Sequence, residues 1–121
     1  MAKKILIVDD EPDILRATKV RLMSFGYEVI TANDGKECMA LLQTDTPDMI
    51  LLDLRLPFMN GDEICLKIKS DEKLKDIPVI IFTASSDVTT SNKVKESGAD
   101  GYLIKPFDPG DLLQIIKKFT D

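Results

Sequence analysis

Histidine is absent from this chain. Its absence removes the commonest general base, the commonest metal ligand and any role as a phosphohistidine carrier. The two cysteines, Cys38 and Cys65, are far apart and fall within helical patterns, so we expect reduced, partly buried thiols and no disulfide or zinc site. Chemistry in this protein therefore has to come from carboxylates, hydroxyls or lysine.

Long hydrophobic runs and basic tracts are also lacking. The apolar stretch that follows Lys4 is too short for a signal peptide, and no run approaches the length needed to span a membrane. Acidic residues outnumber basic ones by 21 to 16, and the resulting net charge of -5 disfavours direct binding to nucleic-acid phosphates. We therefore expect a cytoplasmic protein that binds neither membranes nor nucleic acid directly.

The length and the order of segments predict one α/β domain over residues 1–121. Apolar and amphipathic segments alternate five times, with Gly, Pro, Asp or Asn at the joins, as in successive βαβ units. Right-handed crossovers and short connections favour a doubly wound, flavodoxin-like parallel sheet of strand order 2-1-3-4-5, flanked by five helices. The predicted strands are 4–9, 27–31, 48–53, 78–83 and 102–104; helices are predicted over 12–25 and 87–97, after 35 and 61, and from 109.

Polar side chains follow the apolar segments of four predicted strands. In parallel sheets, ligands bind beyond the carboxyl ends of the strands. With strands one and three side by side, the acids that follow them would converge, and the polar ends of strands four and five would lie next to them. We therefore expect a functional edge formed by Asp9, Asp10, Asp53, Thr83 and Lys105.

Three carboxylates at one edge need a cation. Each pair repels by roughly 1 kcal/mol in water at close range, and by several times more at an effective dielectric near 20. Mg²⁺ suits such a cluster because it prefers oxygen ligands and binds one or two carboxylates together with phosphoryl oxygens. The chain has no glycine-rich phosphate loop, so phosphoryl transfer to a side chain is favoured over nucleotide hydrolysis, and Asp53 is the natural acceptor.

The residues of this predicted edge resemble, in order and spacing, those of the receiver domains of two-component response regulators. The resemblance extends over essentially the whole chain. The resemblance implies a signalling module, not an enzyme in the ordinary sense. A sensor histidine kinase or histidine phosphotransfer protein would phosphorylate it on Asp53, and the phosphorylated form would control a downstream protein target or effector domain. The motifs are Asp9-Asp10, Asp53-Leu54-Arg55-Leu56-Pro57 with Gly61, Thr83-Ala84, and Lys105-Pro106-Phe107.

The resemblance also implies a ligand set for Mg²⁺. Asp10, Asp53 and the backbone carbonyl of Arg55 would bind the ion, and Asp9 would act through a metal-bound water. Arg55 is a departure from the usual pattern, being long and cationic two positions after the acceptor. We interpret Arg55 and Ser85 as neighbours of the site's mouth that set the lifetime of the phosphorylated state.

The resemblance also implies a conformational change on phosphorylation. Thr83 would hydrogen-bond the phosphoryl oxygens, Lys105 would pair with them, and Tyr102 would swing inward as Thr83 moves. The surface of the fourth helix, fifth strand and fifth helix would then change. The bond from Lys105 to Pro106 is expected to be cis, and Ile14 lies on a helix face that commonly docks the kinase in this family.

Other interpretations stay open at this stage. Thr83 could simply satisfy a backbone group, Tyr102 could be an ordinary strand residue with its hydroxyl in water, and Ile14 could be marginal core. Two other functions compete with the signalling module. An aspartate-based phosphohydrolase usually has a second acid as its general acid where this chain has Arg55. A flavodoxin-like binding module would need a Ser/Thr/Gly-rich phosphate loop after the first strand, where this chain has acids. The cognate kinase, the pathway, a phosphorylation-dependent dimer and the extent of the full protein stay open too.

Overall fold

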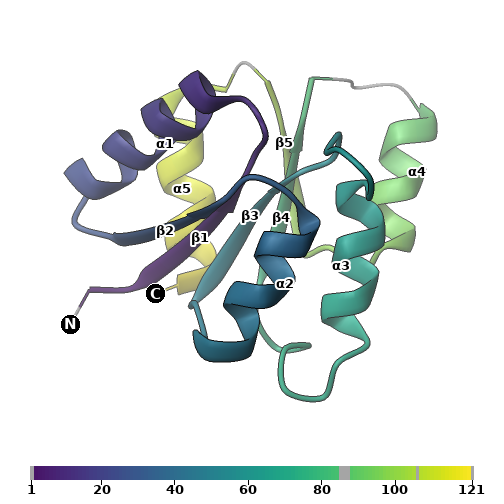
Figure 1. The fold of residues 1–121 in the computed structure, drawn as a ribbon. Coiled ribbons are helices and arrows are strands. Elements are labelled where there is room, and N and C mark those ends of the chain that lie inside the picture. The colour runs from purple at the N-terminus through teal and green to yellow at the C-terminus, as the bar shows by residue number, and fades with distance from the viewer. Residues whose placement is uncertain (1, 85–87, 106, 121) are drawn as a thin grey trace.

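Five strands and five helices alternate along the chain in the computed structural model, which describes residues 2–84, 88–105 and 107–120 (Figure 1). The predicted ends that fall on described residues differ from the observed ones by a single residue at most, while Asp87, the predicted start of the fourth helix, lies outside the described residues. The strands are β1 (Lys4–Val8), β2 (Glu28–Ala32), β3 (Met49–Asp53), β4 (Val79–Thr83) and β5 (Gly101–Ile104); the helices are α1 (Pro12–Ser24), α2 (Gly35–Thr44), α3 (Gly61–Lys69), α4 (Val88–Glu96) and α5 (Pro109–Thr120).

All five strands pair in parallel in the order β2-β1-β3-β4-β5. Helices α1 and α5 cover one face of the sheet, and α2, α3 and α4 cover the other (Figure 1). The doubly wound fold and its strand order are thus confirmed. Within this sheet β1 is next to β3, and Val8 pairs with Leu52, so the residues that follow them reach the same edge together.

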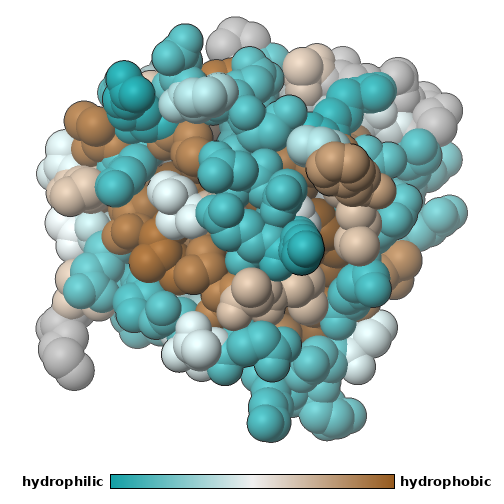
Figure 2. Space-filling view, in the orientation of Figure 1, coloured by the Kyte–Doolittle hydropathy of each residue, from teal (hydrophilic) through white to brown (hydrophobic). Residues whose placement is uncertain are grey.

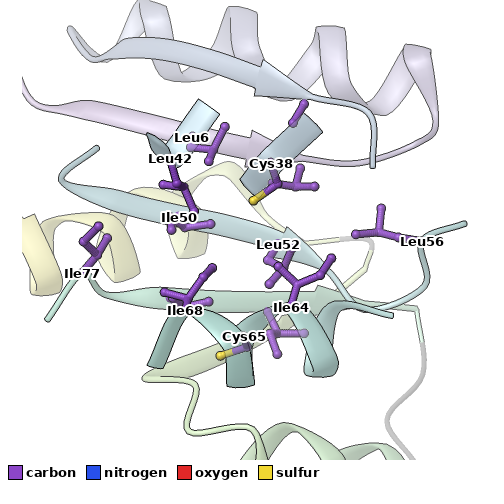
Figure 3. Close-up of a cluster of buried hydrophobic side chains, with 14 of the residues drawn as sticks. Leu6, Cys38, Leu42, Ile50, Leu52, Leu56, Ile64, Cys65, Ile68 and Ile77 are labelled. Carbon is purple, nitrogen blue, oxygen red and sulfur yellow. The ribbon is translucent and has the colours of Figure 1, made fainter. Parts of the chain in front are cut away.

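The helices cover the sheet with two apolar layers. One layer lies under α2 and α3 and includes Cys38, Ile64 and Cys65 (Figure 3), and the other includes Leu22 of α1 and Ile116 of α5. Both cysteines are free and buried, and burial raises the pKa of the Cys38 thiol to about 12. These thiols are therefore core residues with little tendency to form thiolate.

The outer surface follows from the same amphipathic pattern. Hydrophilic side chains predominate over α2 and α3, while apolar surface is visible along the edge strand β2, whose residues Val29, Ile30 and Thr31 are only half-buried (Figure 2). Among the described residues, no helix combines the length and the apolar character that a bilayer span requires.

Candidate functional site

Three carboxylates meet at the carboxyl edge of β1 and β3. Asp9 and Asp10 directly follow β1 and Asp53 is the last residue of β3; one carboxylate oxygen of each lies within 4.8 Å of the others. Asp9 and Asp53 are buried, whereas Asp10 is exposed at the bend that follows β1. The convergence predicted from the strand ends is therefore present in the structure.

A lysine reaches these acids from the far edge of the sheet. Lys105 follows β5, and its Nζ lies 3.3 Å from Oδ2 of Asp9 and 3.2 Å from Oδ2 of Asp53. The side chain is only 14% exposed, so water screens these contacts weakly. Its backbone N–H donates to the carbonyl of Thr83 at 2.7 Å, which ties the end of β5 to the end of β4.

An aromatic residue supports the path of this lysine. The ammonium group of Lys105 lies 4.6 Å from the centroid of the Phe82 ring, and the Phe107 ring packs edge-on against Phe82 at 6.1 Å. A cation over an aromatic face is attracted by the ring's quadrupole, so Phe82 helps to hold the lysine across β4. Sequence reasoning missed this role, because Phe82 is indistinguishable from any other apolar residue of a central strand.

Thr83 occupies the same edge between the acids and the lysine. It ends β4, which lies between β3 and β5, and it is 1% exposed. Phe82 pairs with Asp53 in the sheet register, so Thr83 stands one position further toward the edge than Asp53.

Burial is the main reason that ionised Asp53 is costly here. Desolvation raises the pKa of its carboxyl to about 6, and the nearby charge of Asp9 acts in the same direction, while Lys105 and the backbone N–H of Arg55 oppose the shift. That N–H donates to Oδ1 of Asp53 at 3.2 Å, and the N–H of Glu11 donates to Oδ1 of Asp9 at 2.9 Å. The three acids and one ammonium leave a negative, partly dry cluster that a cation would stabilise.

A glycine lets the loop after β3 close over Asp53. The N–H of Gly61 donates to the carbonyl of Leu54 at 2.7 Å, and a Cβ on Gly61 would overlap the carbonyl oxygen of Asp53. A residue without a Cβ is therefore needed at this position for the loop to approach the end of β3 so closely. Arg55, in the same loop, is exposed, and its backbone N–H is the donor to Asp53.

Tyr102 lies apart from the acidic cluster. It pairs with Ile81, two positions before Thr83 in β4, and 37% of its surface is exposed. Its hydroxyl lies 3.2 Å from Oγ of Ser91 on α4. Ser91 was not identified from the sequence, because the hydrogen bond joins residues on different elements and depends on a side-chain rotamer.

Some expected features carry no structural description. Ser85 and Pro106 lie outside the described residues, so the expected cis bond and the place of Ser85 stay predictions. Ile14 is half-buried on α1, beside Lys105 and Phe107 in an apolar surface pocket, which leaves both of its readings open.

Known proteins resemble this chain in sequence and in fold. Over 110 residues, the chain is 42% identical to the "Probable transcriptional regulator ycf27" of Cyanophora paradoxa, a match that covers 91% of this chain and 45% of that protein. Chemotaxis protein CheY4 of Vibrio cholerae has a similar structure, with a TM-score of 0.92, 33% identity and coverage of 98% of this chain and 99% of that one. The receiver domain of sensor histidine kinase PA1611 from Pseudomonas aeruginosa PAO1, solved with a magnesium ion in its active-site cleft, has a TM-score of 0.92 at 28% identity and covers 99% and 98%.

The chain spans less than half the length of the curated relative, whereas it spans nearly all of the two solved domains. The family model of the response regulator receiver domain matches residues 5–117. With the sheet order, the acid cluster and the lysine in place, this match shows that the chain belongs to the receiver domains of two-component response regulators.

Proposed function

We propose that this chain, as a single domain, is a phosphorylation-activated switch that accepts a phosphoryl group on Asp53 from a sensor histidine kinase or a histidine phosphotransfer protein. The observation that carries the proposal is the contact of Asp53 with Lys105 beside two further acids at the sheet edge. A carboxylate nucleophile, a cation-binding cluster and a fixed ammonium are the groups that phosphoryl transfer requires.

The donor set fits Mg²⁺. Asp10, Asp53 and the backbone carbonyl of Arg55 would hold the ion, with Asp9 acting through a water, and all of these are hard oxygen ligands. The charges point the same way, since three carboxylates face one ammonium and the pKa of Asp53 is raised to about 6. When bound, Mg²⁺ supplies charge neutralisation for the carboxylates and for the phosphoryl oxygens.

Three residues of the chain have separate roles in phosphoryl transfer. An oxygen of the Asp53 carboxylate attacks phosphorus, a P–O bond forms, and the P–N bond to the donor histidine breaks, leaving its electron pair on the imidazole nitrogen. Lys105 exchanges its contacts with Asp9 and Asp53 for the incoming phosphoryl oxygens. The hydroxyl of Thr83, at the neighbouring strand end, donates to the same oxygens.

Phosphorylation is transmitted to the surface of the domain through Thr83 and Tyr102. As Thr83 moves toward the phosphoryl group, Tyr102 leaves its exposed position and turns inward, which changes the surface of α4, β5 and α5. That surface controls a downstream protein partner or an effector domain. In this proposal the domain binds neither nucleic acid nor a membrane directly, and it acts in the cytoplasm. It catalyses only its own phosphorylation and dephosphorylation.

A titration with beryllofluoride, a mimic of the phosphoryl group, tests the proposal. With Mg²⁺ present, the backbone amide spectrum should shift at the edge residues and along α4 and β5, and Asp53→Asn should abolish the response. Asp76→Asn is the matched control, because Asp76 is an exposed acid shortly before β4, at the amino end of the sheet. A wild-type protein that ignores beryllofluoride and Mg²⁺ would contradict the proposal.

A further inference from the structure

The outward position of Tyr102 has a partner on α4. The hydroxyls of Tyr102 and Ser91 lie 3.2 Å apart, within hydrogen-bond distance, and they connect β5 to α4 across a separation of 11 residues in sequence. Tyr102 is 37% exposed and Ile104 is 41% exposed, so this face of β5 is incompletely covered and packing holds the ring only in part. The bond between the two hydroxyls is therefore a specific contact that favours the outward position.

The sheet register places Tyr102 on the same face as Thr83. A Cβ on Gly101 would point at Ile115 and Phe119 of α5, so the next residue, Tyr102, points to the opposite face, toward α4. Tyr102 pairs with Ile81, and Thr83, two residues after Ile81, shares that face. The ring can thus move along one face of the sheet toward Thr83 once it releases α4.

The position of Ser91 on α4 suits this contact. Thr90 and Val94 are buried on the side of α4 that faces the sheet, and Ser97, just after the helix, is buried too. Ser91 is half-buried, next to Thr90 in the helix. A serine there does little for the core, and it has weaker helix propensity than alanine. Its hydroxyl is placed instead to accept or donate the bond to Tyr102.

We propose that Ser91 is a positioning residue of the switch: its hydroxyl holds Tyr102 outward in the unphosphorylated protein and thereby lowers the affinity of the site for a phosphoryl group. The inference deepens the proposed function and rests on it. Binding at Asp53 and the position of Tyr102 are linked, so whatever favours the outward ring weakens binding by the same factor. One net hydrogen bond corresponds to a factor of about 2 to 5 in this equilibrium.

The ring position can be read without any phosphoryl group. The chain has two tyrosines and no tryptophan, so 3-fluorotyrosine labelling gives two ¹⁹F signals, and Tyr27→Phe assigns the one from Tyr102. In the metal-free protein, Ser91→Ala should move the Tyr102 signal toward the position it takes with beryllofluoride and Mg²⁺. Ser91→Thr keeps a hydroxyl at this position and should leave the signal near that of the wild type.

Affinity supplies the second readout. Ser91→Ala and Tyr102→Phe should each tighten beryllofluoride binding by about 2- to 5-fold, and the double variant should gain no more than either one, because both remove the same bond. Unchanged ¹⁹F signal and affinity in Ser91→Ala, with a normal wild-type response to beryllofluoride, would overturn the role of Ser91 alone. A wild-type protein without that response would instead overturn the proposed function, while the metal-free ¹⁹F comparison would still report on the bond.

Discussion

Replacing Asp53 by asparagine should stabilise the metal-free protein at neutral pH, although it removes the ion pair with Lys105. Burial raises the pKa of the Asp53 carboxyl from 3.8 to about 6, so the folded protein resists ionisation of this group more than the unfolded chain does. A shift of about two units corresponds to up to about 3 kcal/mol. Relaxation around the buried charge relieves part of this cost, which leaves about 1–2 kcal/mol.

The sign of the pH dependence follows from proton binding. Between about pH 4 and pH 6 the folded state holds the Asp53 proton while the unfolded chain has released it, so this group makes the free energy of unfolding fall as pH rises through that window. Asparagine cannot ionise, and its amide still offers an oxygen to Lys105. The advantage of Asp53→Asn should therefore be about 1–2 kcal/mol at pH 7.5 and vanish near pH 4.

Urea unfolding at both pH values, in EDTA, measures the difference. In thermal unfolding at pH 7.5, the midpoint of Asp53→Asn should rise by about 3–8 °C for a domain of this size. Asp76→Asn serves as the control, and it should change the midpoint little at either pH. A variant that is no more stable than the wild type at pH 7.5, or whose advantage is the same at pH 4, would show that burial does not make ionised Asp53 costly.

Three further outcomes are expected. Gly61→Ala should lower the free energy of unfolding by about 2 kcal/mol or more, because its Cβ would overlap the Asp53 carbonyl oxygen; urea titration checks this, and a loss under about 0.5 kcal/mol would show that the loop yields freely. Lys105→Met should tighten Mg²⁺ binding by about 3- to 10-fold in calorimetry, since the ammonium competes with the ion for the carboxylates. The same variant should slow phosphorylation by acetyl phosphate at least about 10-fold, because the ammonium no longer holds the phosphoryl group. Weaker Mg²⁺ binding would contradict this. Arg55→Ala should change the dephosphorylation half-life by about 3-fold or more. Mg²⁺ affinity should stay unchanged, because the proposed ligand from Arg55 is its backbone carbonyl. An unchanged half-life would rule out a role of the Arg55 side chain at the mouth of the site.

The main part of the site was predictable because strand ends determine it. Apolar runs that end in Asp9 and Asp53 identify buried strands and their carboxyl ends, and the crossover rules then place the two strands side by side. Lys105 follows from the same argument, because the strand before it is short and apolar. The order of apolar and polar residues along the chain carries this information, and no knowledge of side-chain conformation is required.

The rest depends on side-chain geometry that no local pattern encodes. The ring of Phe82 under the lysine and the bond between Ser91 and Tyr102 each join residues from different elements. The unequal burial of Asp9 and Asp10 likewise depends on how the chain leaves β1. Such features become visible only when the packed arrangement is known.

The most direct test of the switch is to find where the phosphoryl group goes. The protein is incubated with acetyl phosphate and Mg²⁺, the acyl phosphate is reduced with borohydride, and the modified peptide is mapped by mass spectrometry. We expect a single modification, on Asp53, that disappears when EDTA replaces Mg²⁺. A modification on another residue, or none on Asp53 at saturating donor and Mg²⁺, would contradict it.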